Sequence, residues 1–239
     1  LFKIIHNSIM LKFQKNIDLF FVSSLSEKKG VVQNNILEEK IKILPPAMNV
    51  FSIKKQFSTD KKIVYIGRLA KSKNIELLIK AFSKLKTTNV NLIIAGPDFG
   101  MLKELNKITK EHGLVDRVHF TGWISEEEKI KLLSETTIFV HPSLEDVFLL
   151  SLLEAAAIGI PCVAFDVESN STILEDNKTG IIVKDISSEG LSQKLYLLLN
   201  DNKLYDKISK NSRLILPKKF NWELTTKILE NFYYDVVKS

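Results

Sequence analysis

From residue 63 onward, short apolar runs typical of β-strands alternate with amphipathic stretches typical of helices. The expected strands are 63–66, 91–95, 118–120, 138–140, 162–165 and 181–183, and the expected helices are 74–86, 102–112, a stretch opening at 125, 151–158, 187–200, 203–214 and 222–236. Strands that are apolar throughout are typical of a parallel sheet covered on both faces. Because crossovers between parallel strands are right-handed, the sequence predicts an α/β fold with a doubly wound, Rossmann-like parallel sheet.

A different pattern precedes that alternation. Residues 1–60 hold one apolar piece around Leu19–Val22 and another at Ile43–Leu44, followed by two prolines. So little apolar sequence cannot build the core of a domain. We therefore expect the tail of one domain and a linker over 1–60, and a complete domain over 61–215. The chain also begins with Leu1 and not with methionine, so we expect a truncated start.

Composition narrows the class of protein. The chain has 239 residues, 45% of them hydrophobic, and no apolar run approaches the ~20 residues that a membrane span needs. Its single cysteine, Cys162, rules out an internal disulfide and indicates a reducing compartment. The four histidines are scattered along the sequence and form no metal-ligand motif.

The net charge of +6 is carried mainly by lysine, because only three of the 34 basic residues are arginines. A nucleic-acid-binding domain usually clusters arginine with exposed aromatic residues, so we expect no nucleic-acid partner. A lysine-rich solvated surface is the favoured interpretation. A peripheral contact with anionic membrane surfaces is the minor alternative.

The first candidate site follows the first strand of the alternation. Gly67–Leu69 closes that strand, and Arg68 and Lys73 stand in the loop before the next helix. A glycine lets the backbone turn tightly at such a point. Two cations beside a helix N-terminus suit a diphosphate, because the helix dipole and free amides add to their charge. The spacing is common in lysine-rich sequences, and a solvated loop is the competing interpretation.

The second candidate site follows the strand over 138–140. Glu145 and Asp146 lie in the loop, and Glu154 lies within the apolar first turns of the next helix. A carboxylate flanked by leucine and alanine on a helix that packs against a sheet needs a partner or a ligand. An exposed helix edge is the competing interpretation.

Taken in order along the chain, these motifs resemble family 4 retaining glycosyltransferases, which have the GT-B fold. The motifs are Gly67–Leu69 with Lys73, Ile94–Gly96, Phe120–Ile124, Pro142–Ser143 with Asp146, Glu154–Ala155, Gly159–Val163, Glu175–Gly180 and Phe220–Trp222. The resemblance covers nearly everything from residue 60 to the end, and residues 20–51 resemble the last strand of the family's N-terminal domain and its linker. It implies that 61–215 is the nucleotide-sugar-binding half of a GT-B fold. It also implies that 1–60 is a remnant of the acceptor-side domain, and that 216–239 is a helix returning towards that remnant.

The resemblance also implies a role for each site residue. Arg68 and Lys73 would hold the donor diphosphate, and Asp146 would face the donor sugar, which makes these three the expected catalytic residues. Glu154 would accept hydrogen bonds from the ribose hydroxyls. The remaining expected donor-binding residues are Gly67 at the turn, Gly122, Trp123 and Ile124 at the base, and Phe148, Leu149 and Leu150 at the phosphates.

The implied reaction moves a sugar from a nucleotide sugar to a glycan or lipid-linked acceptor with retention of configuration. The resemblance implies that the reaction needs no metal and no other cofactor. It also implies a cytoplasmic protein, with a peripheral position at the inner face of the membrane as the alternative. The chain alone is expected to be inactive, because the acceptor half is missing.

Three departures from the family pattern concern the sugar half of the site. Asp146 is one methylene shorter than the usual glutamate, Val147 and Leu149 stand where the family usually has glycines, and Thr172 replaces a common glutamate. A catalytically degenerate module that binds a nucleotide sugar without turnover is therefore the alternative. An epimerase acting on the nucleotide sugar is a further alternative, disfavoured because it would lack the acid-x7-Glu pattern.

Overall fold

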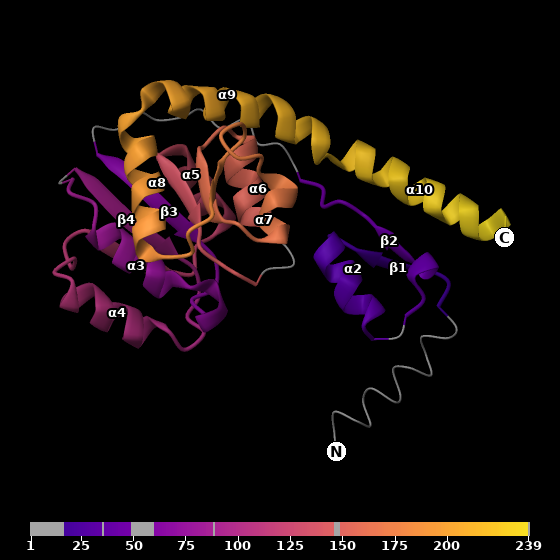
Figure 1. The fold of residues 1–239 in the computed structure, drawn as a ribbon, viewed down its shortest axis with the longest axis horizontal. Coiled ribbons are helices and arrows are strands. Elements are labelled where there is room, and N and C mark those ends of the chain that lie inside the picture. Colours follow the sequence, from indigo (N-terminus) through magenta and orange to yellow (C-terminus); the bar gives the residue numbers. More distant parts are fainter. Residues whose placement is uncertain (1–16, 35, 49–59, 88, 146–148, 239) are drawn as a thin grey trace, which may run out of the picture. The chain divides into compact units, whose positions relative to one another are not determined.

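The computed structural model describes residues 17–34, 36–48, 60–87, 89–145 and 149–238. The chain divides into two compact units. The larger unit is Met48–Lys219, and the smaller unit combines Leu1–Ala47 with Phe220–Ser239. The larger unit holds a sheet with helices on both of its faces (Figure 1).

A six-stranded parallel sheet in the order β5-β4-β3-β6-β7-β8 forms the centre of the larger unit. Its strands are β3 (Lys61–Ile66), β4 (Val90–Ala95), β5 (Val118–Gly122), β6 (Ile138–His141), β7 (Cys162–Phe165) and β8 (Ile181–Val183). β3 is paired on both sides, so that Ile63 lies opposite Leu92 on β4 and Ile138 on β6. All three side chains are fully buried, which explains why the central strands are apolar throughout.

Helices connect these strands and cover the sheet. They are α3 (Ile75–Ser83), α4 (Leu102–Glu111), α5 (Glu126–Ser134), α6 (Leu150–Ala157), α7 (Glu168–Ile173), α8 (Ser188–Asn200) and α9 (Asn202–Lys219), with a 3-10 turn, η2, over Lys71–Lys73. α3 packs against α4 and α8, whereas α6 packs against α9, so the two groups lie on opposite faces (Figure 1). The predicted doubly wound, Rossmann-like fold is confirmed.

Side-chain oxygens accept backbone amides at or just before the start of several of these helices, among them α5 and α4. Ser125 and Glu128 form a capping box at the start of α5, with each side chain accepting the other residue's backbone N–H at 3.2 and 2.7 Å. Asp98 lies three residues before Met101, the N-cap of α4, and its Oδ1 accepts the amides of Gly100, Met101 and Leu102. These bonds, the one from Leu102 first, lower the pKa of the Asp98 carboxyl.

Three helices of the larger unit differ clearly from the sequence expectation. α3 begins one residue later than predicted, because Asn74 takes a left-handed conformation (φ 54°), and it ends at Ser83, three residues earlier than predicted. α9 runs on to Lys219 through Pro217, which removes one hydrogen bond close to the helix end and so does not stop it. α7 was not predicted, because its serine, asparagine and threonine favour turns as readily as helix.

The smaller unit joins both ends of the chain. β1 (Phe20–Val22) pairs in parallel with β2 (Ile41–Ile43), and α2 (Leu25–Val32) and the 3-10 turn η1 (Glu38–Lys40) lie between them in sequence. The C-terminal helix α10 (Trp222–Lys238) packs on this pair. The Phe232 ring lies 5.9 Å from that of Phe21, and the Thr225 hydroxyl donates to the Pro45 carbonyl at 3.3 Å.

Candidate functional site

The strand order reverses direction between β3 and β6. From β3 the chain moves outward through β4 to β5, and then crosses back to place β6 on the other side of β3. In open parallel sheets, ligands bind beyond the carboxyl ends of the strands at such a reversal. The loop after β3 carries Arg68 and Lys73, and the connection after β6 leads into α6, which carries Glu154. Both candidate sites from the sequence therefore lie at this edge.

Two cations flank the start of α3. The Arg68 guanidinium lies over the Phe99 ring, 5.2 Å from its centre. The backbone carbonyl of Arg68 accepts a hydrogen bond from the Tyr65 hydroxyl at 3.0 Å. Lys73 lies in η2, immediately before the residue that precedes α3, and is only 8% exposed. An ammonium group at so enclosed a position is stabilised by anionic or polar partners. The arrangement suits a polyanion at the carboxyl edge.

A hydrogen bond ties the two site loops together. The hydroxyl of Ser143, which follows β6, donates to the carbonyl of Ser72 in η2 at 3.1 Å. Ser143 is buried, so water does not compete for this bond. The loop after β6 is therefore held against the segment that carries Lys73.

Glycines close the ends of three neighbouring strands. The Gly67 amide donates to the Ala95 carbonyl at 2.9 Å, and the Gly96 amide donates to the Gly122 carbonyl at 2.7 Å. Gly96 has a φ of 139°, and a Cβ there would collide with the Gly67 carbonyl. At Gly67 itself, a Cβ would meet the Tyr65 hydroxyl at 2.6 Å. The close approach of backbones at this edge, and not the turn alone, accounts for these glycines.

Glu154 has a partner that the sequence did not identify. The ammonium group of Lys129, on α5, donates to both carboxylate oxygens of Glu154 at 3.1 and 3.0 Å, and lies 2.9 Å from Glu126. The Lys129 and Glu154 side chains are 17% and 16% exposed. Burial lowers the pKa of Lys129, but its hydrogen bonds to Glu126 and Glu154 outweigh that effect and raise it. Lys129 is therefore charged and fixes the carboxylate.

This ion pair leaves acceptor capacity on Glu154. A carboxylate offers about four lone-pair sites, and Lys129 takes one on each oxygen. Each oxygen can therefore still accept a hydroxyl donor, as a ribose would supply. The lysine was missed because its partner lies 25 residues away in sequence. Lys129 lies one turn into α5, just after the candidate base loop. Since that loop was already expected at the site, this position could have marked Lys129 as a candidate partner of Glu154.

The candidate base loop, Gly122 to Ile124, joins β5 to the α5 cap. Gly122 has a φ of 72°, and Trp123 is 72% exposed, so that its indole is accessible to a ligand. Ile124 is partly buried. The loop and Lys129 thus belong to one short segment that approaches Glu154.

The predicted phosphate amides are described only in part. Asp146, Val147 and Phe148 lie outside the described residues. Leu149 is buried at the N-cap of α6, and Leu150 opens the helix with part of its side chain exposed. Leu149 has a φ of −108°, which any residue adopts, so its backbone conformation does not require the glycine usual in the family.

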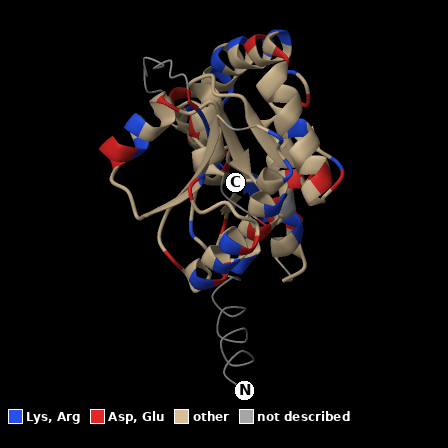
Figure 2. Cartoon of the chain, turned by 90° about the vertical axis from the view of Figure 1, so that its left-hand side faces the viewer, with Lys and Arg blue, Asp and Glu red and all other residues tan. Residues whose placement is uncertain are grey.

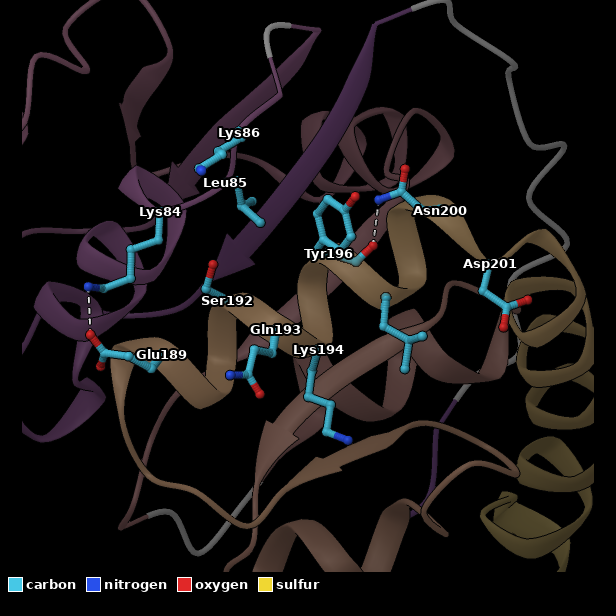
Figure 3. A pocket seen from close by; sticks show the side chains of 11 residues that line it. Lys84, Leu85, Lys86, Glu189, Ser192, Gln193, Lys194, Tyr196, Asn200 and Asp201 are labelled. Carbon is cyan, nitrogen blue, oxygen red and sulfur yellow. Dashed lines mark hydrogen bonds and ion pairs between the residues drawn. The ribbon is translucent and has the colours of Figure 1, made fainter.

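A surface groove of about 860 Å³ lies away from this edge, between the end of α3 and α8 (Figure 3). An ion pair between Lys84 and Glu189, 2.6 Å long, bridges its rim. Lys61 at the start of β3 donates to the Leu199 carbonyl, which places the end of α8 at the amino edge of the sheet. The groove contains none of the predicted donor-binding residues.

The comparisons with known proteins define the class. Residues 49–215 match the family described as glycosyl transferases group 1. The chain belongs to this family, and its larger unit has the architecture of the C-terminal half of a GT-B fold.

Individual relatives are distant and longer. An uncharacterized glycosyltransferase of Methanocaldococcus jannaschii is 26% identical over 235 residues, which cover 93% of this chain and 60% of that protein. An N-acetylgalactosamine-N,N'-diacetylbacillosaminyl-diphospho-undecaprenol 4-alpha-N-acetylgalactosaminyltransferase of Campylobacter jejuni is 30% identical over 228 residues, or 90% of this chain and 61% of that enzyme. The chain thus spans about three fifths of these two relatives' lengths.

The fold itself recurs in solved structures. Anabaena HepE, determined in complex with UDP and glucose, superposes with a TM-score of 0.83 over 91% of this chain and 63% of its own, at 19% identity. At that identity the similarity establishes the fold alone.

Proposed function

We propose that this chain is the donor-binding half of a retaining glycosyltransferase that uses a nucleotide sugar. The observation that carries the proposal is the placement of Arg68 and Lys73 after β3 and of Glu154 after β6, at the reversal of strand order. Cations and an acidic acceptor on the two sides of such a point match the two ends of a nucleoside diphosphate.

Each residue has a distinct role in this proposal. Arg68 and Lys73 neutralise the diphosphate, whose negative charge grows as the bond to the sugar breaks, so they act most strongly in the transition state. Glu154, oriented by Lys129, accepts hydrogen bonds from the ribose. Trp123 and its neighbours Gly122 and Ile124 contact the base. Gly67, Leu149 and Leu150 supply backbone to the phosphates, and Asp146 faces the sugar.

The proposal also covers partners and surroundings. The Campylobacter relative's name specifies a lipid-linked acceptor, and the HepE structure contains UDP and glucose, which supports a nucleotide-sugar donor and a glycan or lipid-linked acceptor here. We propose a reaction without a metal or other cofactor. Cys162, a buried free thiol, fits a cytoplasmic setting.

Transfer of a radiolabelled sugar, assayed with the protein at its full natural length, tests the proposal. We expect transfer from a nucleotide sugar with the anomeric configuration kept, and loss of turnover in Arg68→Ala. Nucleotide-sugar binding with no transfer to any acceptor would instead favour the binding-only module that Val147 motivates.

The chain by itself is expected to bind a nucleoside diphosphate without transferring sugar, because the acceptor half of the fold is not in it. Calorimetry should show an affinity that falls as salt rises, since cations meet a polyanion. Sugar transfer by this chain alone would contradict the assignment of the donor half.

A further inference from the structure

Helix α9 carries a net charge of +5, more than the +4 of residues 1–60, while the remaining residues are net negative. α9 holds five lysines and one arginine against a single aspartate, whereas the rest of residues 61–239 holds 19 basic and 22 acidic residues. The net charge of +6 is therefore not spread evenly over the molecule. Blue bands recur along the helix at the top of Figure 2, where α9 lies.

The lysines of α9 face away from the sheet. Ile208, Ser212 and Leu216 form its buried stripe, against the sheet side. Lys203, Lys207 and Lys210 follow the spacing i, i+4, i+7 on the opposite face, and all three are exposed. Within the part of the chain that the structure describes, no ion pair involves any of these three lysines.

Helix α4 shows what an ordinary solvated lysine face looks like in this protein. Lys103, Lys107 and Lys110 have the same spacing and are also exposed. On α4, however, Glu104 and Glu111 accompany them, and Lys107 lies 3.8 Å from the Glu111 carboxylate. Solubility alone is achieved there with nearly balanced charge. The unbalanced face of α9, called the α9 lysine face below (Lys203, Lys207 and Lys210), therefore calls for an anionic partner.

An apolar side chain lies within the same face. Leu214 follows Lys210 by one turn and is 53% exposed. Tyr205, the aromatic residue of the helix, points elsewhere, since its hydroxyl donates to the Thr137 carbonyl at 3.1 Å. A row of lysines that ends next to an exposed leucine suits a lipid headgroup layer, which accepts both charge and an apolar tip. A nucleic acid would favour arginine and exposed aromatic rings.

We infer that the α9 lysine face, with Leu214 one turn beyond its last lysine, docks the protein on the surface of an anionic lipid bilayer. The contact is peripheral, because among the described residues no helix is long and apolar enough to cross a bilayer. The α9 lysine face contains none of the residues assigned to donor binding. A test of the docking is therefore independent of a test of the proposed function.

Co-sedimentation of the chain with lipid vesicles tests this docking. The vesicles are phosphatidylcholine alone or phosphatidylcholine mixed with phosphatidylglycerol. We expect binding to the mixed vesicles only, with an affinity that falls as salt rises. The triple variant Lys203→Gln/Lys207→Gln/Lys210→Gln should bind on the order of 100-fold more weakly, at the contribution typical of a lysine near an anionic surface. Leu214→Gln should weaken binding less and leave its salt dependence unchanged.

The matched control is Lys103→Gln/Lys107→Gln/Lys110→Gln on α4, which removes the same charge at the same spacing. It should bind the mixed vesicles as the unaltered chain does. Arg213 is left in place in all variants, because it packs against Gly159 and its loss could disturb the fold. Circular dichroism and a thermal melt confirm that each variant is folded.

Three results would overturn the inference. The first is absence of binding to the mixed vesicles, and the second is equal loss in the two triple variants, which would mean that net charge alone matters. The third is tighter binding to duplex DNA than to the mixed vesicles at the same salt, abolished by the α9 variant, which would assign the face to nucleic acid.

Discussion

Lys129 and Glu154 form the most informative pair of side chains at the carboxyl edge. Glu154 is the residue whose place in an apolar helix marks it as unusual, and Lys129 is the cation that donates to both of its carboxylate oxygens there. The two hydrogen bonds also hold the Glu154 carboxylate in one orientation. Sequence reasoning could single out Glu154 but not its partner, because the contact depends on how α5 and α6 pack.

Replacing Lys129 by methionine should weaken nucleoside diphosphate binding by about 1 kcal/mol, because Glu154 must then be ordered when the ligand binds. It should also lower the free energy of unfolding by about 1 kcal/mol, since the half-buried carboxylate loses its counter-charge. Titration calorimetry and urea denaturation measure the two effects.

Glu126→Gln serves as the control for that variant. Glu126 is the more exposed partner of Lys129, and its loss leaves the Lys129–Glu154 contact in place. Nucleotide affinity should therefore stay the same. If Lys129→Met changed neither affinity nor stability, the pair would have no positioning role.

Cys162 gives a second test at the residue scale. Burial on β7 raises the pKa of its thiol well above the usual range, so the reactive thiolate is scarce in the folded protein. A thiol reagent should therefore modify Cys162 only as fast as the protein opens, and the reaction should track unfolding in urea. Rapid labelling of the native protein at neutral pH would show that β7 is accessible.

At the scale of elements, the glycines that end β3 and β4 set how closely the site loops can approach. Gly96→Ala should destabilise the protein by about 3 kcal/mol or more, because the methyl group meets the Gly67 backbone at a positive φ. Gly100→Ala is the matched control: it also has a positive φ, 92°, but no atom lies near its Cβ position. It should cost about 1–2 kcal/mol.

Urea denaturation of both variants separates backbone strain from collision. Equal destabilisation would mean that the close approach of the Gly67 and Gly96 backbones contributes nothing.

The sequence predicted the strands more closely than the helix ends. Continuous runs of buried apolar residues fix β7 and β8 to the residue, because both faces of the sheet are covered by helices. Helix ends depend on local conformations that composition does not reveal, such as the left-handed Asn74 before α3. α2 in the smaller unit escaped prediction as well, since its eight residues have no clear apolar face.

At the scale of the whole molecule, the predicted site could be located because the fold orders its loops. Residues far apart in sequence, such as Arg68 and Glu154, reach the same edge once the strand order is known. The sequence alone does not reveal which side chains pair across elements, such as Lys129 with Glu154. It also does not reveal which face of α9 is buried, and therefore which of its lysines face outward. Both depend on three-dimensional packing.

The central claim is that the carboxyl edge at β3 and β6 binds a nucleoside diphosphate, with the phosphates at Arg68 and the ribose at Glu154. Calorimetric titration of a nucleoside and its diphosphate against the chain, Arg68→Ala and Glu154→Gln tests it most directly, after thermal melts show that each variant is folded. Arg68→Ala should weaken the diphosphate by about 2 kcal/mol and leave the nucleoside unchanged, since the contact is to phosphate. Glu154→Gln should weaken both ligands by about 1–2 kcal/mol, because both carry the ribose. Equal weakening of both ligands by Arg68→Ala, or no effect of Glu154→Gln on either, would contradict the account.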